Sequence, residues 1–516
     1  MCAALPLCGA GSRWPWTAAF LSLAIMAATA ADWPQYRGPN HDGTSTDRIV
    51  KLWPDNGPPE IWRVPCTNGL SSLAVSGGRV FTQIRRSDGI EDREVCVALD
   101  ANTGAELWAV DIGPTNYSGG VGYDDGPRST PSVQNGRVFV LSSFLNLYAL
   151  DATNGTAIWT RDLLSLYGGF VIGWENAASP LLDNDLIIIN CNTPAQSLFA
   201  LRTSDGSVAW RTQNEGMTHS TPVIATIQGL PQLVFATQSG LVGLNRTNGA
   251  LLWKAVYPFN YSTSIGVSPV VHSNIVFISA NYSMASFATQ ISISNMTFVP
   301  SPLWTNAALK AHWMTPVSYQ GFLYGQFGSG SFDGPNAQLK CIDLLTGATR
   351  WSTNGFGRGG TILVDNHILT LTEMGDLVLV KPDPNAYTPV ARFTLFPDFD
   401  FDTNKCWNVP AIADGRIYAR STALAVCLDV SVPPLKMFSP QFGANHRLQL
   451  WIGTTTGAAI DPTRLATIEV RATSNLSPNA GSWTTLTNAL VLTNGLVRVD
   501  DVDSGAIRYY IVSEQP

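Results

Sequence analysis

The sequence predicts an all-β protein: an eight-bladed β-propeller that an N-terminal strand closes, followed by a small C-terminal β-sandwich. Three features predict it. An eleven-residue unit recurs along the chain, a pattern of a small residue followed by Pro alternates with it, and an isolated tryptophan strand precedes the first full repeat. Only 13% of the residues are charged, while Gly and Pro are abundant, which is typical of a β-rich protein with many tight turns.

The N-terminus has the pattern of a signal peptide over residues 1–30. It carries a single charge, an apolar stretch at 17–26 and small residues at 28–30. The apolar stretch is shorter than the ~20 residues that span a bilayer, and no later segment reaches that length. We therefore expect an exported protein of the periplasm, outer envelope or extracellular space, with an uncleaved anchor as the alternative. Residues 31–60 then form an extended segment ahead of the repeats.

Charge and cysteines exclude several classes of function. A formal charge of −7 gives no electrostatic footprint for nucleic acid. The six cysteines beyond the signal peptide have no CxxC spacing and no neighbouring histidines, so we predict no metal site. Phosphate-loop, zinc-protease, serine-hydrolase and dinucleotide signatures are absent, so no catalytic residue is assigned. Cys66 and Cys406 fall in connectors between predicted blades, where a disulfide is one alternative and two free thiols the other.

The recurring unit has the form Ala-x-Asp-x-x-Thr-Gly-x-x-x-Trp. Its spacing of 42–51 residues suits one four-stranded blade. Its turn residues supply the positive φ of a two-residue hairpin, and the Asp side chain is expected to accept hydrogen bonds from the turn amides. Close copies lie at 98–108, 149–159, 200–210, 243–253 and 341–351, and worn copies end at Trp304 and Phe393.

The tryptophans are expected to pack between blades, because each begins a strand directly after a turn. An aromatic ligand cage is the alternative. The predicted docking residues are Trp62, Trp108, Trp159, Trp210, Trp253, Trp304 and Trp351.

Ring closure follows from the two ends of the array. The small-residue–Pro pattern has eight copies, and the last one, 410–429, lacks its own Gly turn and tryptophan strand. The isolated strand 60–64 supplies that missing piece one period ahead of Trp108. We therefore expect the N-terminal strand to complete the eighth blade, which removes two open sheet edges, and we place the propeller at 61–431.

The unit resembles the tryptophan-docking motif of pyrroloquinoline quinone (PQQ)-like repeat propellers over residues 61–430. Segments 31–40 (ADWPQYRGPN) and 126–131 (GPRSTP) resemble exported bacterial members. The superfamily holds quinoprotein alcohol dehydrogenases, whose resemblance implies PQQ and calcium, and an outer-membrane assembly propeller that binds no cofactor. The vicinal cysteine pair of the dehydrogenases is missing here, and only Glu175-Asn176 matches part of their calcium set.

Residues 432–516 change character after the propeller. Apolar strands separated by Asn-Gly, Ser-Gly and Pro turns predict a small β-sandwich. It resembles C-terminal modules of exported bacterial proteins.

A candidate ligand site lies at the mouth of the central funnel. Aligning the eight copies on the Pro position gives a ring of residues three places earlier. Arginines, tryptophans and a histidine converging there favour an anionic or planar partner, while the alternative is a plug of side chains that satisfy one another. The ring is Leu70, Arg128, Ala177, His219, Gly266, Trp313, Arg358 and Trp407, with Glu175, Asn176, His312, Lys405 and Asn408 beside it.

Two functions remain open on the sequence. The first is a non-catalytic binding or scaffolding propeller at the cell envelope, without a cofactor, monomeric, with a protein or small molecule at the funnel. The alternative is a PQQ-dependent oxidoreductase of alcohols or sugars, which would use calcium.

Overall fold

The computed structural model describes residues 32–87, 89–115, 126–257, 265–282, 284–328, 337–400, 403–443, 447–474, 483–501 and 508–515. The predicted signal peptide lies outside these residues. The described chain separates into two compact units, Thr29–Ser431 and Val432–Pro516. Within these ranges, no helix has the length and apolar character needed to cross a membrane.

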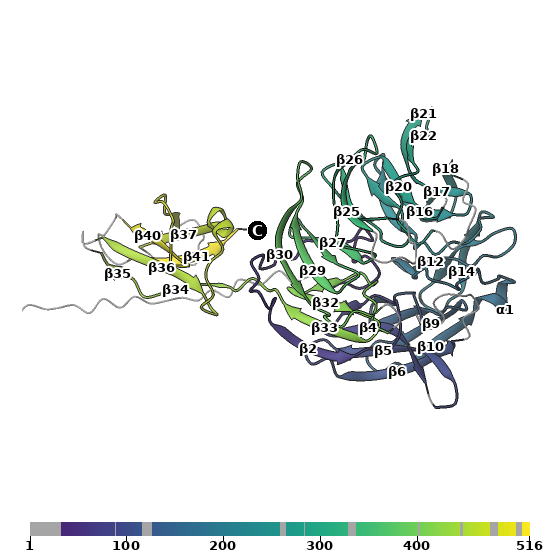
Figure 1. Cartoon of the computed structure of the whole chain (residues 1–516), viewed down its shortest axis with the longest axis horizontal. Helices are drawn as coiled ribbons and strands as arrows, with labels where there is room; N and C mark the ends of the chain where they lie inside the picture. Colours follow the sequence, from purple (N-terminus) through teal and green to yellow (C-terminus); the bar gives the residue numbers. More distant parts are fainter. Residues whose placement is uncertain are drawn as a thin grey trace, which may run out of the picture. The chain divides into compact units, whose positions relative to one another are not determined.

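The unit Thr29–Ser431 consists of antiparallel sheets arranged around a common centre, which confirms the all-β propeller (Figure 1). Its described residues form eight sheets, seven of four strands and one of five. The first four sheets contain β3 (Ala74–Ser76), β4 (Arg79–Ser87), β5 (Asp92–Asp100), β6 (Glu106–Pro114); β7 (Ser132–Gln134), β8 (Arg137–Leu141), β9 (Asn146–Asp151), β10 (Ala157–Asp162); β11 (Leu181–Asp183), β12 (Leu186–Asn190), β13 (Leu198–Arg202), β14 (Val208–Thr212); and β15 (Val223–Ile227), β16 (Leu230–Thr237), β17 (Gly240–Asn245), β18 (Leu251–Val256).

The remaining four sheets follow the same order of strands. They contain β19 (Val270–His272), β20 (Ile275–Ser279), β21 (Ser286–Ser294), β22 (Thr297–Asn306); β23 (Val317–Tyr319), β24 (Phe322–Phe327), β25 (Gln338–Asp343), β26 (Thr349–Thr353); β27 (Gly360–Val364), β28 (His367–Leu371), β29 (Asp376–Lys381), β30 (Thr388–Thr394) with β1 (Thr44–Ser45); and β31 (Ala411–Ala413), β32 (Arg416–Arg420), β33 (Leu424–Asp429) with β2 (Glu60–Pro65). The short helix α1 (Leu163–Tyr167) follows β10.

The turn chemistry of the repeat is as expected. Asp100 Oδ1 accepts hydrogen bonds of 2.9 Å from the amides of Asn102 and Thr103. Gly104 takes a φ of +71° in the turn that follows. The same acceptor pattern recurs at Asp151 and Asp343. The local sequence therefore sets each hairpin between the third and fourth strands of a sheet.

Five indole rings lie against a turn glycine of the next sheet, those of Trp62, Trp108, Trp159, Trp210 and Trp304. A Cβ placed on Gly155 would lie 2.9 Å from the Trp108 ring, and Trp108 Nε1 donates to the carbonyl of Ala152 at 3.1 Å. Only glycine leaves room for a ring at this turn. Trp62, Trp159, Trp304 and Trp351 also donate from Nε1 to a carbonyl of the following sheet.

Two tryptophans depart from this pattern. Trp210 lies against Gly249, but its buried Nε1 has no hydrogen-bond partner in the described chain. Trp253 Nε1 instead donates to Gln232 Oε1, within its own sheet. Trp210 thus keeps the contact with a turn glycine of the next sheet, whereas the Trp253 ring lies against Gly243 of its own sheet.

The ring closes as predicted. Strand β2 pairs antiparallel with β33, so the N-terminal strand completes the last sheet, and Trp62 lies opposite Cys427. At the start of the inner strands, the Val409 amide donates to Ser72 Oγ at 3.1 Å. Residues 409 and 72 belong to the last and first repeats, so this contact joins the two ends of the array.

Residues 32–49 belong to the propeller unit and run along the inner strands. Trp33 forms a β-bridge with Val75 of β3, and β1 pairs in parallel with β27. The side chain of Arg37 is 2% exposed and donates to the carbonyls of Thr315 and Pro316 at 3.0 and 2.8 Å. The N-terminal segment thus contacts inner strands on several sides of the channel.

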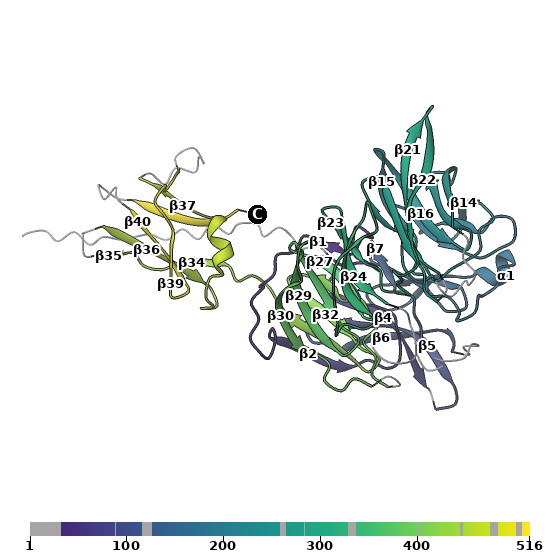
Figure 2. The same cartoon turned by 45° about the horizontal axis from the view of Figure 1, so that its top comes forward.

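The unit Val432–Pro516 contains two antiparallel sheets that enclose one apolar cluster, including Leu450, Val470 and Val497. This is the predicted sandwich architecture. Its elements are β34 (Leu435–Met437), β35 (Gln441–Phe442), β36 (Leu448–Thr454), a 3-10 helix (Pro462–Ala466), β37 (Ile468–Thr473), β38 (Thr484–Thr485), β39 (Val491–Thr493), β40 (Leu496–Asp501) and β41 (Tyr509–Glu514) (Figure 2).

The cysteines of the propeller unit are free and buried. Cys66 and Cys406 are therefore two separate thiols in this structure and not a disulfide. Burial raises the pKa of the Cys406 thiol to about 12, which keeps it protonated and unreactive at neutral pH.

Candidate funnel site

The predicted ring residues lie in the connectors that lead into the inner strands. A group on the sixth to eighth repeats is in contact. The rings of Trp313 and Trp407 have centroids 4.5 Å apart at 41°. The guanidinium carbon of Arg358 lies 4.8 Å from the Trp407 ring centroid and 5.8 Å from that of Trp313. We call Trp313, Arg358 and Trp407 with Glu373 the mouth cluster.

Glu373 was not among the predicted site residues, yet it organises the mouth cluster. Its Oε1 accepts from Arg358 Nε at 3.0 Å and from Trp407 Nε1 at 2.9 Å, and its Oε2 accepts from the Arg358 amide at 3.0 Å. The side chain is 1% exposed. It lies in the turn between β28 and β29, where the sequence Thr-Glu-Met-Gly resembles any polar hairpin turn. Only the fold brings that turn next to the ring position.

Further polar and aromatic groups extend the mouth cluster. Lys405 is 6% exposed, and its Nζ lies 4.9 Å from the Trp407 ring centroid. On the other side, the His312 ring lies 4.7 Å from the ring of Trp313 and 5.2 Å from that of Tyr282. Two cations and a row of aromatic rings therefore meet here, and the buried carboxylate of Glu373 pairs with Arg358.

A second group forms on the second to fourth repeats. Arg128 Nη1 donates to the carbonyl of Trp174 at 3.3 Å, and His219 Nε2 contacts the carbonyl of Glu175 at 2.7 Å. Trp174 and Glu175 both have left-handed backbone conformations, with φ of 70° and 55°. Such a pair is uncommon outside glycine, and the flanking arginine and histidine hold its two carbonyls.

The calcium-ligand role that the resemblance implies for Glu175-Asn176 does not fit the side chain of Asn176. The Asn176 amide nitrogen donates to the Ala178 carbonyl at 3.0 Å, and its oxygen accepts from the Ala178 amide at 3.1 Å. The Asn176 side chain is thus used to shape its own turn. Within the described ranges, no three His, Cys, Asp or Glu side chains are grouped as a metal site would require.

The remaining predicted residues have structural contacts. Asn408 Nδ2 donates to the Ser71 carbonyl at 2.9 Å, beside the ring closure. Gly266 donates its amide to the His312 carbonyl at 2.9 Å, and a Cβ on Gly266 would lie 3.2 Å from that of Trp313. Ala177 and Leu70 are half-buried positions of the same ring.

The chain is similar in sequence to several known proteins. The family model described as outer membrane protein assembly factor BamB matches residues 91–353, just over half of the chain. The protein of that name from Moranella endobia (strain PCIT) is 27% identical over 293 residues, which cover 55% of this chain and 70% of that protein. A tetrathionate hydrolase from Acidithiobacillus ferrooxidans is 30% identical over 139 residues, 27% of this chain and 26% of that enzyme.

Among solved structures, the quinohemoprotein alcohol dehydrogenase from Comamonas testosteroni superposes with a TM-score of 0.59. It is 14% identical, with 84% of each chain covered. At that identity the likeness concerns the fold alone.

Proposed function

The chain belongs to the family of the outer membrane protein assembly factor BamB, and from that membership we propose that it is a non-catalytic binding and scaffolding protein of the cell envelope. The family match carries this proposal. Export by the signal peptide at residues 1–30 and a monomeric state belong to the same proposal.

The mouth cluster supports a binding role at the funnel. A guanidinium and an ammonium over an indole offer an anionic or planar group both charge and a flat apolar surface. We propose that a partner presents such a group to Trp407 and Trp313, which are only half-buried. The competing hypothesis is that these side chains plug the channel and bind no ligand. Both hypotheses predict the same contacts within the mouth cluster, so only a binding experiment distinguishes them.

Photo-crosslinking in the native host tests the binding role. A photoreactive phenylalanine at Leu70 or Arg128 samples the funnel mouth, and the same group at Met296 is the control. Met296 is 97% exposed at the turn between β21 and β22, far along the sheet from the inner strands. We expect an envelope protein to be captured from the mouth positions and not from position 296. Equal capture from all three would exclude a specific site at the mouth.

The oxidoreductase alternative has its own test. PQQ and calcium are added to the purified protein, and dye-linked oxidation of alcohols and sugars is followed. We expect neither saturable quinone absorbance nor turnover, because Asn176 is committed to its own turn. Turnover that is lost in Glu175→Ala would overturn the non-catalytic proposal.

A further inference from the structure

The inner strands share one inward-facing position. In each sheet the first two strands form a two-residue hairpin, so alternate residues of the inner strand turn their N–H and C=O toward the channel. The inward residue lies two places after the Pro position. Around the ring it is Val75, Val133, Leu182, Ile224, Val271, Ser318, Leu363 and Ile412.

The N-terminal segment satisfies four of these eight positions. The Val75 amide donates to the Trp33 carbonyl at 2.7 Å, and the Val133 amide donates to the Pro34 carbonyl at 2.7 Å. The two other bonds run from Leu182 N–H to Gln35 Oε1 at 3.4 Å and from Leu363 N–H to the Gly43 carbonyl at 2.8 Å. In every case the acceptor is an amide carbonyl oxygen. The N-terminal segment thus shows that the inward N–H groups at these positions bind amide carbonyl oxygens.

The segment leaves a gap at the fourth, fifth and sixth repeats. Between the contact of Gln35 with the third repeat and that of Arg37 with the sixth, it crosses the channel. Within the described ranges, no hydrogen bond reaches the inward groups of Ile224, Val271, Ser318 or Ile412, and the first three of these follow one another around the ring. These three consecutive positions line a cavity of about 650 Å³. Its size is that of a site for a small ligand or a short peptide.

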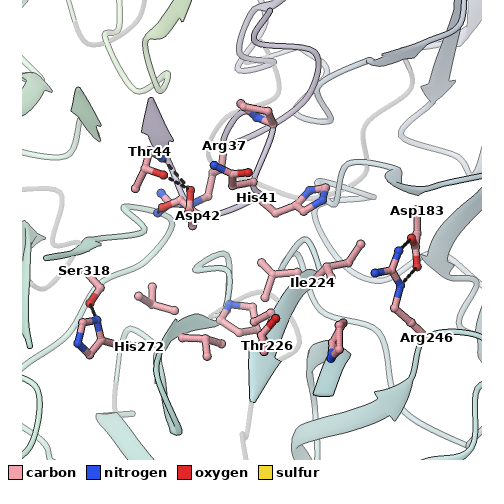
Figure 3. Close-up of a pocket in the computed structure, with 18 of the residues that line it drawn as sticks. Arg37, His41, Asp42, Thr44, Asp183, Ile224, Thr226, Arg246, His272 and Ser318 are labelled. Carbon is pink, nitrogen blue, oxygen red and sulfur yellow. Dashed lines mark hydrogen bonds and ion pairs between the residues drawn. The ribbon is translucent and has the colours of Figure 1, made fainter. Parts of the chain in front are cut away.

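The walls of the cavity are polar but balanced in charge (Figure 3). Asp183 and Arg246 form an ion pair at one side, and His272 Nδ1 contacts Ser318 Oγ at 3.0 Å at the other. His41, from the N-terminal segment, has a buried Nδ1 without a hydrogen-bond partner in the described chain. Figure 3 shows its ring across from Ile224. Arg37 and Asp42 also line the cavity; the Arg37 guanidinium donates to backbone carbonyls, and Asp42 Oδ1 accepts from Thr44. The lining thus holds two arginines and two aspartates, and with no net charge it suits a neutral hydrogen-bonding ligand better than a charged one.

We propose that this cavity binds a short, extended, uncharged peptide segment of a partner protein. Its backbone carbonyls accept from the amides of Ile224, Val271 and Ser318, in the way that Trp33, Pro34 and Gly43 serve the other repeats. Its polar groups also supply a partner for His41 Nδ1. The peptide would cross the inner edges of three sheets and make one main-chain hydrogen bond with each, as Trp33 and Pro34 do at the first two repeats. The proposal goes beyond the funnel mouth, since it uses the inner strands themselves and not the connectors that lead into them.

The test measures binding of a capped pentapeptide of alternating Thr and Val to the full-length protein by calorimetry, with maltotriose as a neutral saccharide arm. Residue-resolved hydrogen exchange accompanies it. We expect saturable peptide binding that slows exchange at Ile224, Val271 and Ser318. The matched position Ile412 does not line the cavity and should be unaffected. No saturable binding, or protection by maltotriose alone, would overturn the proposal.

A proline variant locates the bond. Val271→Pro removes an inward N–H while the ladder bonds of residues 270 and 272 to β20 remain, and Pro is tolerated at such edge positions. Loss of one hydrogen bond should weaken peptide binding about tenfold. Ile412→Pro is the control and should leave the affinity unchanged. Unchanged affinity in a folded Val271→Pro protein would place the peptide elsewhere. If Val271→Pro fails to fold, the exchange pattern of the unmodified protein decides. The funnel-mouth tests use other residues, so the two proposals fail separately.

Discussion

The amide of Ser72 donates a 3.0 Å hydrogen bond to Thr130 Oγ1, one link of a belt that joins the starts of the inner strands. Each donor is the residue directly before the Pro position, and each acceptor is the hydroxyl at the same place in the next repeat. The other links run from Val409 to Ser72, Thr130 to Ser179, Ser179 to Thr221 and Ser268 to Thr315. This explains why Ser or Thr recurs before Pro.

The belt predicts different costs for removing a hydroxyl at equivalent places. Thr130→Val leaves the buried Ser72 amide without its acceptor and should lower the free energy of unfolding by about 1–3 kcal/mol. Ser268→Ala is the matched control, because the buried Ser268 Oγ has no partner in the described chain. It should be neutral or slightly stabilising. Thermal unfolding of both variants decides, and equal losses would exclude a stabilising role for the belt.

The tryptophans offer a second matched pair. Trp304 Nε1 donates to the Leu344 carbonyl at 2.9 Å, whereas the buried Trp210 Nε1 has no partner in the described chain. Replacement by Phe removes a similar ring volume at both places. Trp304→Phe should therefore destabilise more than Trp210→Phe, by about 1 kcal/mol. Chemical unfolding measures the difference. A larger loss at position 210 would show that ring packing alone sets the energy.

The repeated features of the fold follow from the sequence because their causes are local. The Asp100 turn and the Gly155 contact with Trp108 each use residues within one or two repeats. Closure of the propeller ring by strand 60–64 could also be predicted from the sequence, because one repeat period separates Trp62 from Trp108.

Contacts between distant repeats of the ring cannot be predicted from the repeat pattern. Glu373 reaches Arg358 and Trp407 from a hairpin turn whose sequence is ordinary, and Arg37 reaches Thr315 across 278 positions. Single, unrepeated contacts leave no periodic signal. Alignment of the repeats could therefore place Trp313, Arg358 and Trp407 at equivalent positions, but it could predict neither the carboxylate that joins them nor the course of the N-terminal segment.

The pH dependence of stability should contain a contribution from His41. Burial, with the nearby positive charge of Arg246, lowers the pKa of His41 from 6.5 to about 4. Between these values the unfolded chain binds the proton more readily than the folded one. The stabilisation is therefore complete above about pH 6.5 and is lost as the pH falls toward 4, by an amount on the order of 1–3 kcal/mol.

Unfolding of His41→Asn measured between pH 4 and 7 isolates that contribution. Asn tolerates the left-handed backbone of position 41, where φ is 61°. The variant should show a flatter pH profile than the unmodified protein. An unchanged slope would mean that the imidazole is equally protonated in both states.

The mouth cluster should respond cooperatively to substitution. Glu373→Gln removes the buried counter-charge of Arg358, whose side chain is 8% exposed, and should cost about 3 kcal/mol. Adding Arg358→Met removes the stranded cation, so the double variant should be more stable than the sum of the single losses predicts. A double-mutant cycle by chemical unfolding measures this coupling, and strict additivity would contradict an energetic pair.

Removal of residues 432–516 should leave the propeller folded. The apolar cluster of the C-terminal unit draws on Leu450, Val470 and Val497, and none of the clusters of the propeller unit includes a residue beyond Val430. A chain ending at Ser431 keeps the pairing of β2 with β33 that closes the ring. We therefore expect its unfolding to remain cooperative, with a midpoint within a few degrees of that of the full-length protein, because separate cores unfold as separate units. Calorimetry of the two proteins tests this, and the full-length protein should show the additional transition of the C-terminal unit. A truncated chain that no longer unfolds cooperatively would mean that the propeller depends on residues after 431, against the boundary proposed from the sequence.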